Sequence, residues 1–115
     1  MSEYDSFVRD RLPPVELQPD FLPLDYPERL NAAAELLKGG AAGDLAVINA
    51  HGRWTYGELD AFSGRIARLL VDQHGLVPGN RVLLRGPNSY TIYAAWLGVL
   101  KAGGVVVATM PLLRP

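Results

Sequence analysis

The sequence lacks cysteine entirely and has only two histidines among its 115 residues. The absence of cysteine excludes a disulfide scaffold and any metal centre built on thiolates. His51 and His74 stand far apart without metal-ligand spacing, so we interpret both as structural residues and expect no metal site. The N-terminus also lacks the basic start and apolar core of a secretory signal, so we expect a cytoplasmic protein.

Acidic residues are scarce in the second half of the chain. Residues 1–60 carry eleven acids and five bases, whereas residues 61–115 carry six bases and a single acid, Asp72. The two halves nearly cancel, which leaves a formal net charge of −1. Such a balance provides no overall field to attract nucleic acid or anionic lipid, so we expect neither as a partner.

Only one stretch is apolar enough to suggest a membrane span, Thr91 to Leu113, and Lys101 is its single charge. A charge at the centre of a span costs about 3 kcal/mol on insertion scales. Gly103 and Gly104 would also break a helix at that place. We therefore interpret the stretch as a buried helix followed by a buried strand.

Glycine is absent from residues 1–27, which contain five of the nine prolines. Proline cannot donate to a helix or sheet ladder, so we predict an extended arm. Its apolar residues are too numerous for a solvated linker and predict that the arm lies against a folded body. They are Phe7, Leu12, Val15, Leu17, Phe21, Leu22, Leu24 and Tyr26. The chain is thus divided into the arm, residues 1–27, and an α/β subdomain, residues 28–115.

A first helix is predicted to begin after Asp25, which resembles an N-cap with Pro27 in the first turn and Glu28 three residues on. One apolar stripe follows at helical spacing. It consists of Leu30, Ala33, Ala34 and Leu37. The glycine pair at residues 39–40 is expected to end this helix.

A β-hairpin followed by a capped helix is predicted next. The apolar segments 46–48 and 53–55 flank the turn sequence Asn-Ala-His-Gly at residues 49–52. Thr55 and Glu58 form a capping box, and Trp54 with Leu59 adds a hydrophobic staple. The helix that follows is expected to stop near Gly75.

The remaining sequence predicts a parallel βαβ unit and so an α/β fold class. Residues 77–80, Val-Pro-Gly-Asn, favour a type II turn that leads into a strand at 81–85. Asn88 or Ser89 is expected to cap a helix through about Leu100, and a second strand follows at 105–109. Such a crossover is right-handed and its strands are parallel. The unbroken valines of the second strand indicate that both of its faces are covered.

The turn at residues 85–89 is the best placed candidate for binding an anion, since it follows a parallel strand and begins a helix. A turn between strand and helix needs the same residue types merely to reverse the chain, so the structural interpretation is favoured. The glycine-rich phosphate motifs are absent. Ser63 and Ser89 lie in no nucleophile motif, and Lys101 is most simply a helix-end residue that complements the dipole.

Several motifs occur in an order that resembles the N-terminal region of AMP-forming acyl- and aryl-CoA synthetases. They are W-T-Y-G-E-L at 54–59, V-P-G-N-R-V at 77–82, G-P-N-S at 86–89 and A-A-W-L-G-V-L-K-A-G-G-V-V-V at 94–107. This adenylate-forming superfamily includes luciferases and peptide-synthetase adenylation domains. Y-P-E-R-L-N-A-A-A-E-L-L at 26–37 and A-T-M-P-L-L-R-P at 108–115 are similar to benzoate- and 2-aminobenzoate-CoA ligases in particular.

The resemblance, which covers residues 20–115, implies an ATP- and Mg²⁺-dependent reaction of a carboxylate through an acyl-AMP to an acyl-CoA. It also implies that the catalytic motifs lie outside this chain, so we assign no catalytic residue and expect no cofactor bound here. Related ligases can place a basic residue just after the proline of the strand-end loop to meet the CoA phosphates. Leu112 stands there, which leaves Arg114, two residues later, as the candidate for that contact.

We therefore interpret the chain as a scaffold segment of an aryl-acid CoA ligase that is inactive alone. A fatty acyl-CoA synthetase or a peptide-synthetase adenylation domain is the nearest alternative. A separate interaction module is the alternative from another class. Besides the rest of the parent ligase, we expect a second copy of the chain as a partner, because a valine-rich strand at an open edge favours a homo-oligomer.

Overall fold

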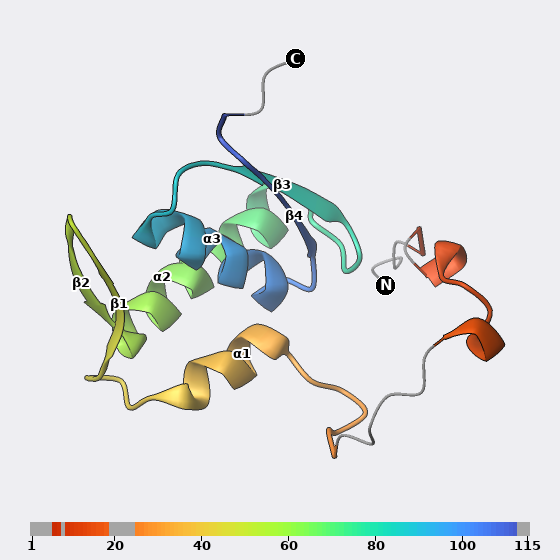
Figure 1. Cartoon of the computed structure of the whole chain (residues 1–115), viewed down its shortest axis with the longest axis horizontal. Coiled ribbons are helices and arrows are strands. Elements are labelled where there is room, and N and C mark those ends of the chain that lie inside the picture. The colour runs from red at the N-terminus through yellow and green to blue at the C-terminus, as the bar shows by residue number, and fades with distance from the viewer. Residues whose placement is uncertain (1–5, 8, 19–24, 113–115) are drawn as a thin grey trace.

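A computed structural model describes residues 6–7, 9–18 and 25–112 of the chain. Within these residues, a hairpin and a parallel strand pair lie on either side of two central helices (Figure 1). The order along the chain is α1 Ala32–Leu36, β1 Leu45–Asn49, β2 Gly52–Thr55, α2 Tyr56–Arg68, β3 Arg81–Arg85, α3 Tyr90–Lys101 and β4 Val105–Thr109. The α/β class predicted from the sequence is confirmed.

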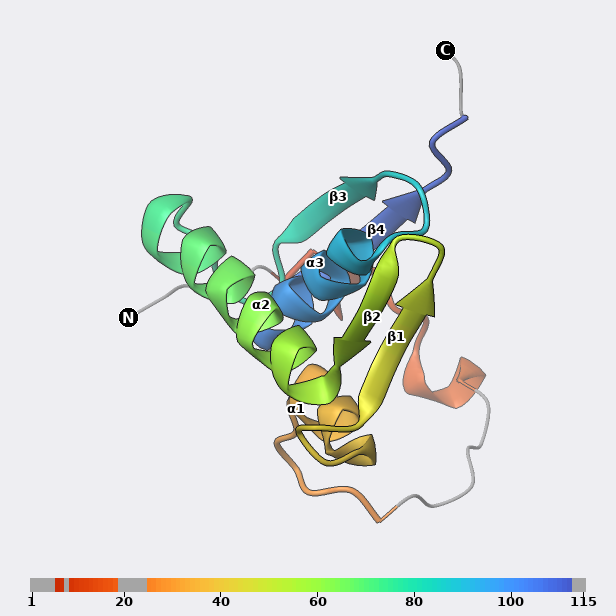
Figure 2. The ribbon, with the colours of Figure 1, turned by 90° about the vertical axis from the view of Figure 1, so that its left-hand side faces the viewer.

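The predicted hairpin is confirmed. Strands β1 and β2 pair antiparallel, with Ile48 opposite Arg53 and Asn49 opposite Gly52. The Asn49 side chain accepts a hydrogen bond from the backbone N–H of His51 at 2.8 Å, which stabilises the turn. Figure 2 shows the hairpin beside α2 and α3, with β3 and β4 on the far side of α3.

The predicted capping box begins α2. The Thr55 hydroxyl accepts from the Glu58 N–H at 3.2 Å, and the Glu58 carboxylate accepts from the Thr55 N–H at 2.8 Å. A π-helical turn, Leu69–Gln73, continues the helix. It ends at Gly75, whose φ of +63° is the left-handed conformation that glycine adopts without strain. Both predicted ends of the helix are therefore confirmed.

The βαβ unit also has the predicted form. Gly79 has a φ of +90° in the type II turn before β3. Strands β3 and β4 are parallel and pair from Arg81 with Val105 to Arg85 with Thr109. The Ser89 hydroxyl accepts from the N–H of Ile92 at 3.2 Å and so caps α3.

The core lies between α2 and α3, with α1 packed against α3. Ala33, Leu59, Ala94 and Leu97 are its buried residues. The contact is close because position 98 is glycine: a Cβ there would lie 2.7 Å from Cγ2 of Ile66. The fully buried Ser63 adds no unpaired polar atom, since its hydroxyl donates to the carbonyl of Leu59 at 2.8 Å.

The predicted start of the first helix is wrong. Helix α1 begins at Ala32, with Asn31 as its N-cap, and Asp25 and Glu28 precede it without helical structure. The Asn31 side chain accepts from the Ala34 N–H at 3.1 Å and donates to the carbonyl of Lys101 at 3.2 Å. A tertiary contact at the end of α3 thus reinforces this cap, and the local motif at Asp25 has no such support.

The expectation that β4 is covered on both faces is also wrong for the described residues. Helix α3 packs against both β3 and β4. On the β3–β4 sheet, however, Leu83 is 64% exposed and Val107, its partner in the register, 41% exposed. The continuous valines of β4 are therefore only partly covered by the described residues.

The N-terminal arm has less extended structure than expected. It contains two 3-10 turns, Arg9–Arg11 and Val15–Leu17. The centre of the Phe7 ring lies 4.4 Å from the guanidinium carbon of Arg81, so the arm contacts the folded body at this residue. The expectation that the apolar side chains of the arm pack against the body is otherwise wrong for the described residues, since Leu12, Leu17 and Tyr26 are 57%, 73% and 62% exposed. Three of the arm's apolar residues lie outside the described residues: Phe21, Leu22 and Leu24.

No helix among the described residues is both long and apolar enough to cross a membrane. The apolar stretch that begins at Thr91 forms most of α3 and then β4, as the sequence analysis predicts. The division into an arm and a subdomain at residue 27 stays a prediction.

Candidate functional site

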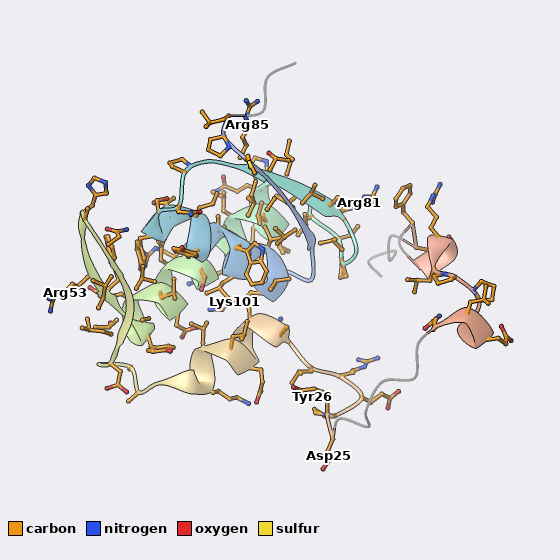
Figure 3. All side chains as sticks on the ribbon, viewed as in Figure 1. Asp25, Tyr26, Arg53, Arg81, Arg85 and Lys101 are labelled. Carbon is orange, nitrogen blue, oxygen red and sulfur yellow. The ribbon has the colours of Figure 1, made fainter. Side chains whose placement is uncertain are left out.

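The carboxyl ends of β3 and β4 are the first place to look for a site, because α/β sheets bind ligands there. The turn at residues 86–89 leaves β3 at this edge and leads into α3. Figure 3 shows Arg81 and Arg85 at opposite ends of β3. The Arg85 guanidinium donates to the carbonyl of Pro111 at 3.1 Å, so it connects the segments that follow the two strands.

This geometry gives the turn a structural role. The Ser89 hydroxyl is engaged as the cap of α3, and Arg85 holds the chain after β4. Arg114, the candidate for contact with CoA phosphates, lies outside the described residues and stays a prediction.

Lys101 has a partner that the sequence pattern does not reveal. Its ammonium group forms an ion pair with the Asp60 carboxylate and donates to the Asp60 backbone carbonyl at 2.9 Å. The Lys101 side chain is 16% exposed, although it lies at the end of α3 (Figure 3). No spacing rule connects residues on two different helices, so the signal for this pair exists only in three dimensions.

Asn31 joins the same region. Its amide donates to the carbonyls of Leu100 and Lys101 at 3.4 and 3.2 Å. Asn31, Asp60 and Lys101 thus bind the start of α1, the outer side of α2 and the end of α3 together. We call these three residues the helix junction, and its contacts point to a structural role.

A second cluster joins the hairpin to α3. The Trp54 ring stacks on Tyr90 at 4.5 Å with an interplanar angle of 4°, and the Phe62 ring lies 5.5 Å from Tyr90. Burial raises the pKa of Tyr90 above its ordinary value of 10.0, the negative charge of Glu58 raises it further, and Arg65 opposes both. Tyr90 therefore stays protonated at neutral pH and is no activated base.

Among the residues that the structure describes, the titratable side chains do not gather into a catalytic arrangement. No group of three or more His, Asp or Glu residues that could hold a metal ion occurs in the part of the chain that the structure describes. His51 lies in the hairpin turn and His74 at the end of the π-helical turn. The Ser63 hydroxyl is buried against its own helix.

An apolar groove of about 420 Å³ lies between α1, β1, α2 and α3. Aliphatic and aromatic side chains form its walls. They are Leu36, Leu37, Ala46, Val47, Ile48, Tyr56, Leu59, Tyr93, Trp96 and Leu97. Sequence reasoning missed this groove, because it is formed by elements that the chain brings together only on folding.

Known proteins resemble this chain in sequence. The sequence pattern of the family described as AMP-binding enzyme matches residues 38–115. A 3-hydroxybenzoate--CoA/4-hydroxybenzoate--CoA ligase from Thauera aromatica is 37% identical over 92 residues, which cover 76% of this chain and 17% of that protein. Surfactin synthase subunit 2 from Bacillus subtilis is 48% identical over 58 residues, which cover 50% of this chain and 2% of that protein.

Among solved structures, a benzoate CoA ligase from Burkholderia xenovorans LB400 matches with a TM-score of 0.64 and 37% identity. The match covers 70% of this chain and 17% of that chain. This chain therefore spans at most 17% of the length of the relatives named here. Because the family pattern extends over most of its residues, the chain belongs to the AMP-binding enzyme family, and the relatives named here include both aryl-CoA ligases and a surfactin synthase.

Proposed function

We propose that this chain is an N-terminal scaffold segment of an AMP-forming aryl-acid CoA ligase. The complete protein would convert ATP, an aromatic carboxylate and CoA into aryl-CoA, AMP and pyrophosphate through an aryl-AMP. In this proposal the segment supplies the hairpin, the helix pair and the first two parallel strands, and later sequence supplies the catalytic groups.

The observation that carries the proposal is how far the match to the hydroxybenzoate ligase extends. Since 76% of 115 residues is about 87 residues, that match must begin at or before Arg29. It therefore includes Asn31 and α1. The match to surfactin synthase covers only 50% of the chain and does not need this segment. Similarity that extends through α1 favours an aryl-CoA ligase over a peptide synthetase.

The described residues do not fit ATP, Mg²⁺ or CoA by themselves. The Asp60 carboxylate is paired with Lys101, the Glu58 carboxylate is used in the capping box, and no third acid joins either. Stabilising the charge on a transferring phosphoryl group is normally the largest catalytic contribution. We therefore propose that the 115-residue chain is inactive alone and derive no reaction step within it.

The test is ATP–pyrophosphate exchange by the longer protein that contains this sequence. The acids compared are benzoate, 2-aminobenzoate, 3- and 4-hydroxybenzoate, a fatty acid and the common amino acids. We expect exchange with an aromatic acid and none with the isolated chain. Exchange with amino acids alone would replace the proposal by a peptide-synthetase adenylation domain, and exchange by the isolated chain would refute its role as scaffold.

A further inference from the structure

A hollow of about 370 Å³ with both aromatic and charged walls lies where the end of β2 and the start of α3 meet α2. Helix α2 contributes one face to it, through residues at helical spacing. These residues are Glu58, Ala61, Phe62 and Arg65. Trp54 of β2 and Tyr90 of α3 complete the lining. The rings of Trp54, Phe62 and Tyr90 are only half-buried, so part of this surface stays open to solvent. We call the lining residues together the aromatic hollow.

The three rings of the aromatic hollow hold one another in place. Trp54 stacks on Tyr90 with the ring centres 4.5 Å apart, and the Phe62 ring is tilted by 32° against that of Tyr90. Aromatic rings attract one another in offset or edge-to-face arrangements with centres about 4.5–7 Å apart. A fixed set of ring faces and edges therefore favours a ligand whose apolar part is a planar aromatic ring.

Charges of both signs border these rings. The Arg65 guanidinium lies 5.4 Å from the centre of the Phe62 ring and has no carboxylate partner among the described residues. Glu58 uses the Oε2 oxygen of its carboxylate in the capping box, which leaves Oε1 for another donor. Burial raises the pKa of Tyr90, Glu58 raises it further and Arg65 lowers it, so both charges lie near the phenol. The hollow thus offers a cation, an anion and a hydroxyl around one aromatic surface.

This combination selects one class of small molecule. A guanidinium pairs best with a carboxylate, and the free oxygen of Glu58 accepts a hydrogen bond from an amine or hydroxyl. The negative charge of Glu58 disfavours a polyphosphate. We propose that the aromatic hollow binds a small aromatic carboxylate with a hydrogen-bond donor beside the carboxyl group, with the carboxylate on Arg65 and the donor on Glu58. The site consists of residues of this chain alone, so the proposal does not depend on the proposed function.

The test is an NMR titration of the isotope-labelled chain with 2-aminobenzoate. The two tryptophans report two surfaces separately, because Trp54 lines the aromatic hollow and Trp96 lines the apolar groove. We expect the indole N–H signal of Trp54 to shift saturably, with a dissociation constant of about 1 mM, and that of Trp96 to stay unchanged. Benzoate lacks the donor and cyclohexanecarboxylate lacks the aromatic ring, so each should bind at least about threefold more weakly.

Variants of α2 test the two charges. Arg65→Gln should weaken binding of 2-aminobenzoate about tenfold, whereas Arg68→Gln, the matched control on the same helix outside the hollow, should leave it unchanged. Glu58→Gln keeps a residue that suits the capping box and should reduce the preference for 2-aminobenzoate over benzoate.

Equal losses for Arg65→Gln and Arg68→Gln would overturn the proposal, because the effect would then be one of overall charge. Shifts at Trp96 as large as those at Trp54, or shifts that do not saturate, would overturn it as well. If Arg65→Gln fails to fold, the order of affinities of the three acids for the unsubstituted chain decides, and equal affinities would refute the site. Binding is the readout, so absence of ATP–pyrophosphate exchange would count against the proposed function alone.

Discussion

Lys101 and Asp60, 41 positions apart in the sequence, hold α3 and α2 together through two contacts of one ammonium group. The lysine is largely buried, whereas the Asp60 side chain is 63% exposed. We predict that Lys101→Met lowers the free energy of unfolding by about 1–2 kcal/mol, since it removes both charge-assisted contacts. Asp60→Asn keeps the backbone carbonyl of residue 60 as an acceptor for Lys101. It should therefore lower the free energy of unfolding by less than about 1 kcal/mol.

Urea denaturation of the chain measures both changes. Lys38→Met is the matched control, because Lys38 pairs with Glu35 on the same short helical segment with a side chain that is 70% exposed. It should change stability by no more than about 0.5 kcal/mol. Equal losses for Lys38→Met and Lys101→Met would contradict the role assigned to the helix junction.

Gly98 marks the closest approach of α3 to α2. A Cβ at this position would lie 2.7 Å from Ile66 Cγ2 and 3.0 Å from the Ser63 carbonyl oxygen. Gly98→Ala is therefore expected to destabilise the chain by about 1–3 kcal/mol, although alanine favours helix. Gly64→Ala is the control: its Cβ would meet nothing nearer than the Lys101 Nζ at 4.0 Å, so it should stabilise by about 0.5–1 kcal/mol.

Tyr90 predicts how stability changes at alkaline pH. Its pKa is raised in the folded state above the ordinary value of 10.0, so the folded protein holds the phenolic proton more tightly than the unfolded chain. The contribution of this proton to the free energy of unfolding is complete below pH 10, and it is lost as the pH rises through the raised pKa of Tyr90. We expect the urea denaturation midpoint to fall as the pH rises from 9 to 11.5, roughly one to two units either side of pH 10. The fall should be less steep for Tyr90→Phe than for the unsubstituted chain.

The open edge of β4 predicts self-association of the isolated chain. Val107 is 41% exposed, and no charged residue lies within β4. We expect a concentration-dependent dimer in analytical ultracentrifugation, and a shift toward monomer in Val107→Lys, because charge at an edge strand opposes pairing. If the unsubstituted chain stays monomeric at every concentration, the edge of β4 is not an interface.

Much of the fold could be predicted because its signals are local. The Thr55 and Glu58 capping box, the turn at Gly79 and the alternation of strand and helix around α3 all lie within a few residues of what they determine. The motif at Asp25 was equally local, yet the helix begins after Asn31. Tertiary contacts from Asn31 to the end of α3 reinforce that start, and no window around residue 25 contains this information.

The candidate surfaces were less predictable, because they are formed by residues that lie far apart in the sequence. Asp60 has a largely exposed side chain on α2, and nothing near it in the sequence identifies Lys101 as its partner. Trp54 stacks on Tyr90, a partner 36 positions along the chain that the staple motif does not indicate. The groove is formed by α1, β1, α2 and α3 together. Each of these contacts depends on topology, which periodicity alone does not specify.

The position of Asn31 also constrains the order in which the molecule can assemble. Its amide binds carbonyls 69 and 70 residues later in the chain. During synthesis α1 emerges from the ribosome well before α3, so these two contacts cannot form until the later helix is complete. The hairpin turn and the capping box of α2 depend on contacts between residues close in the sequence and can form first. The first helix of the chain is thus among the last to be fixed in place.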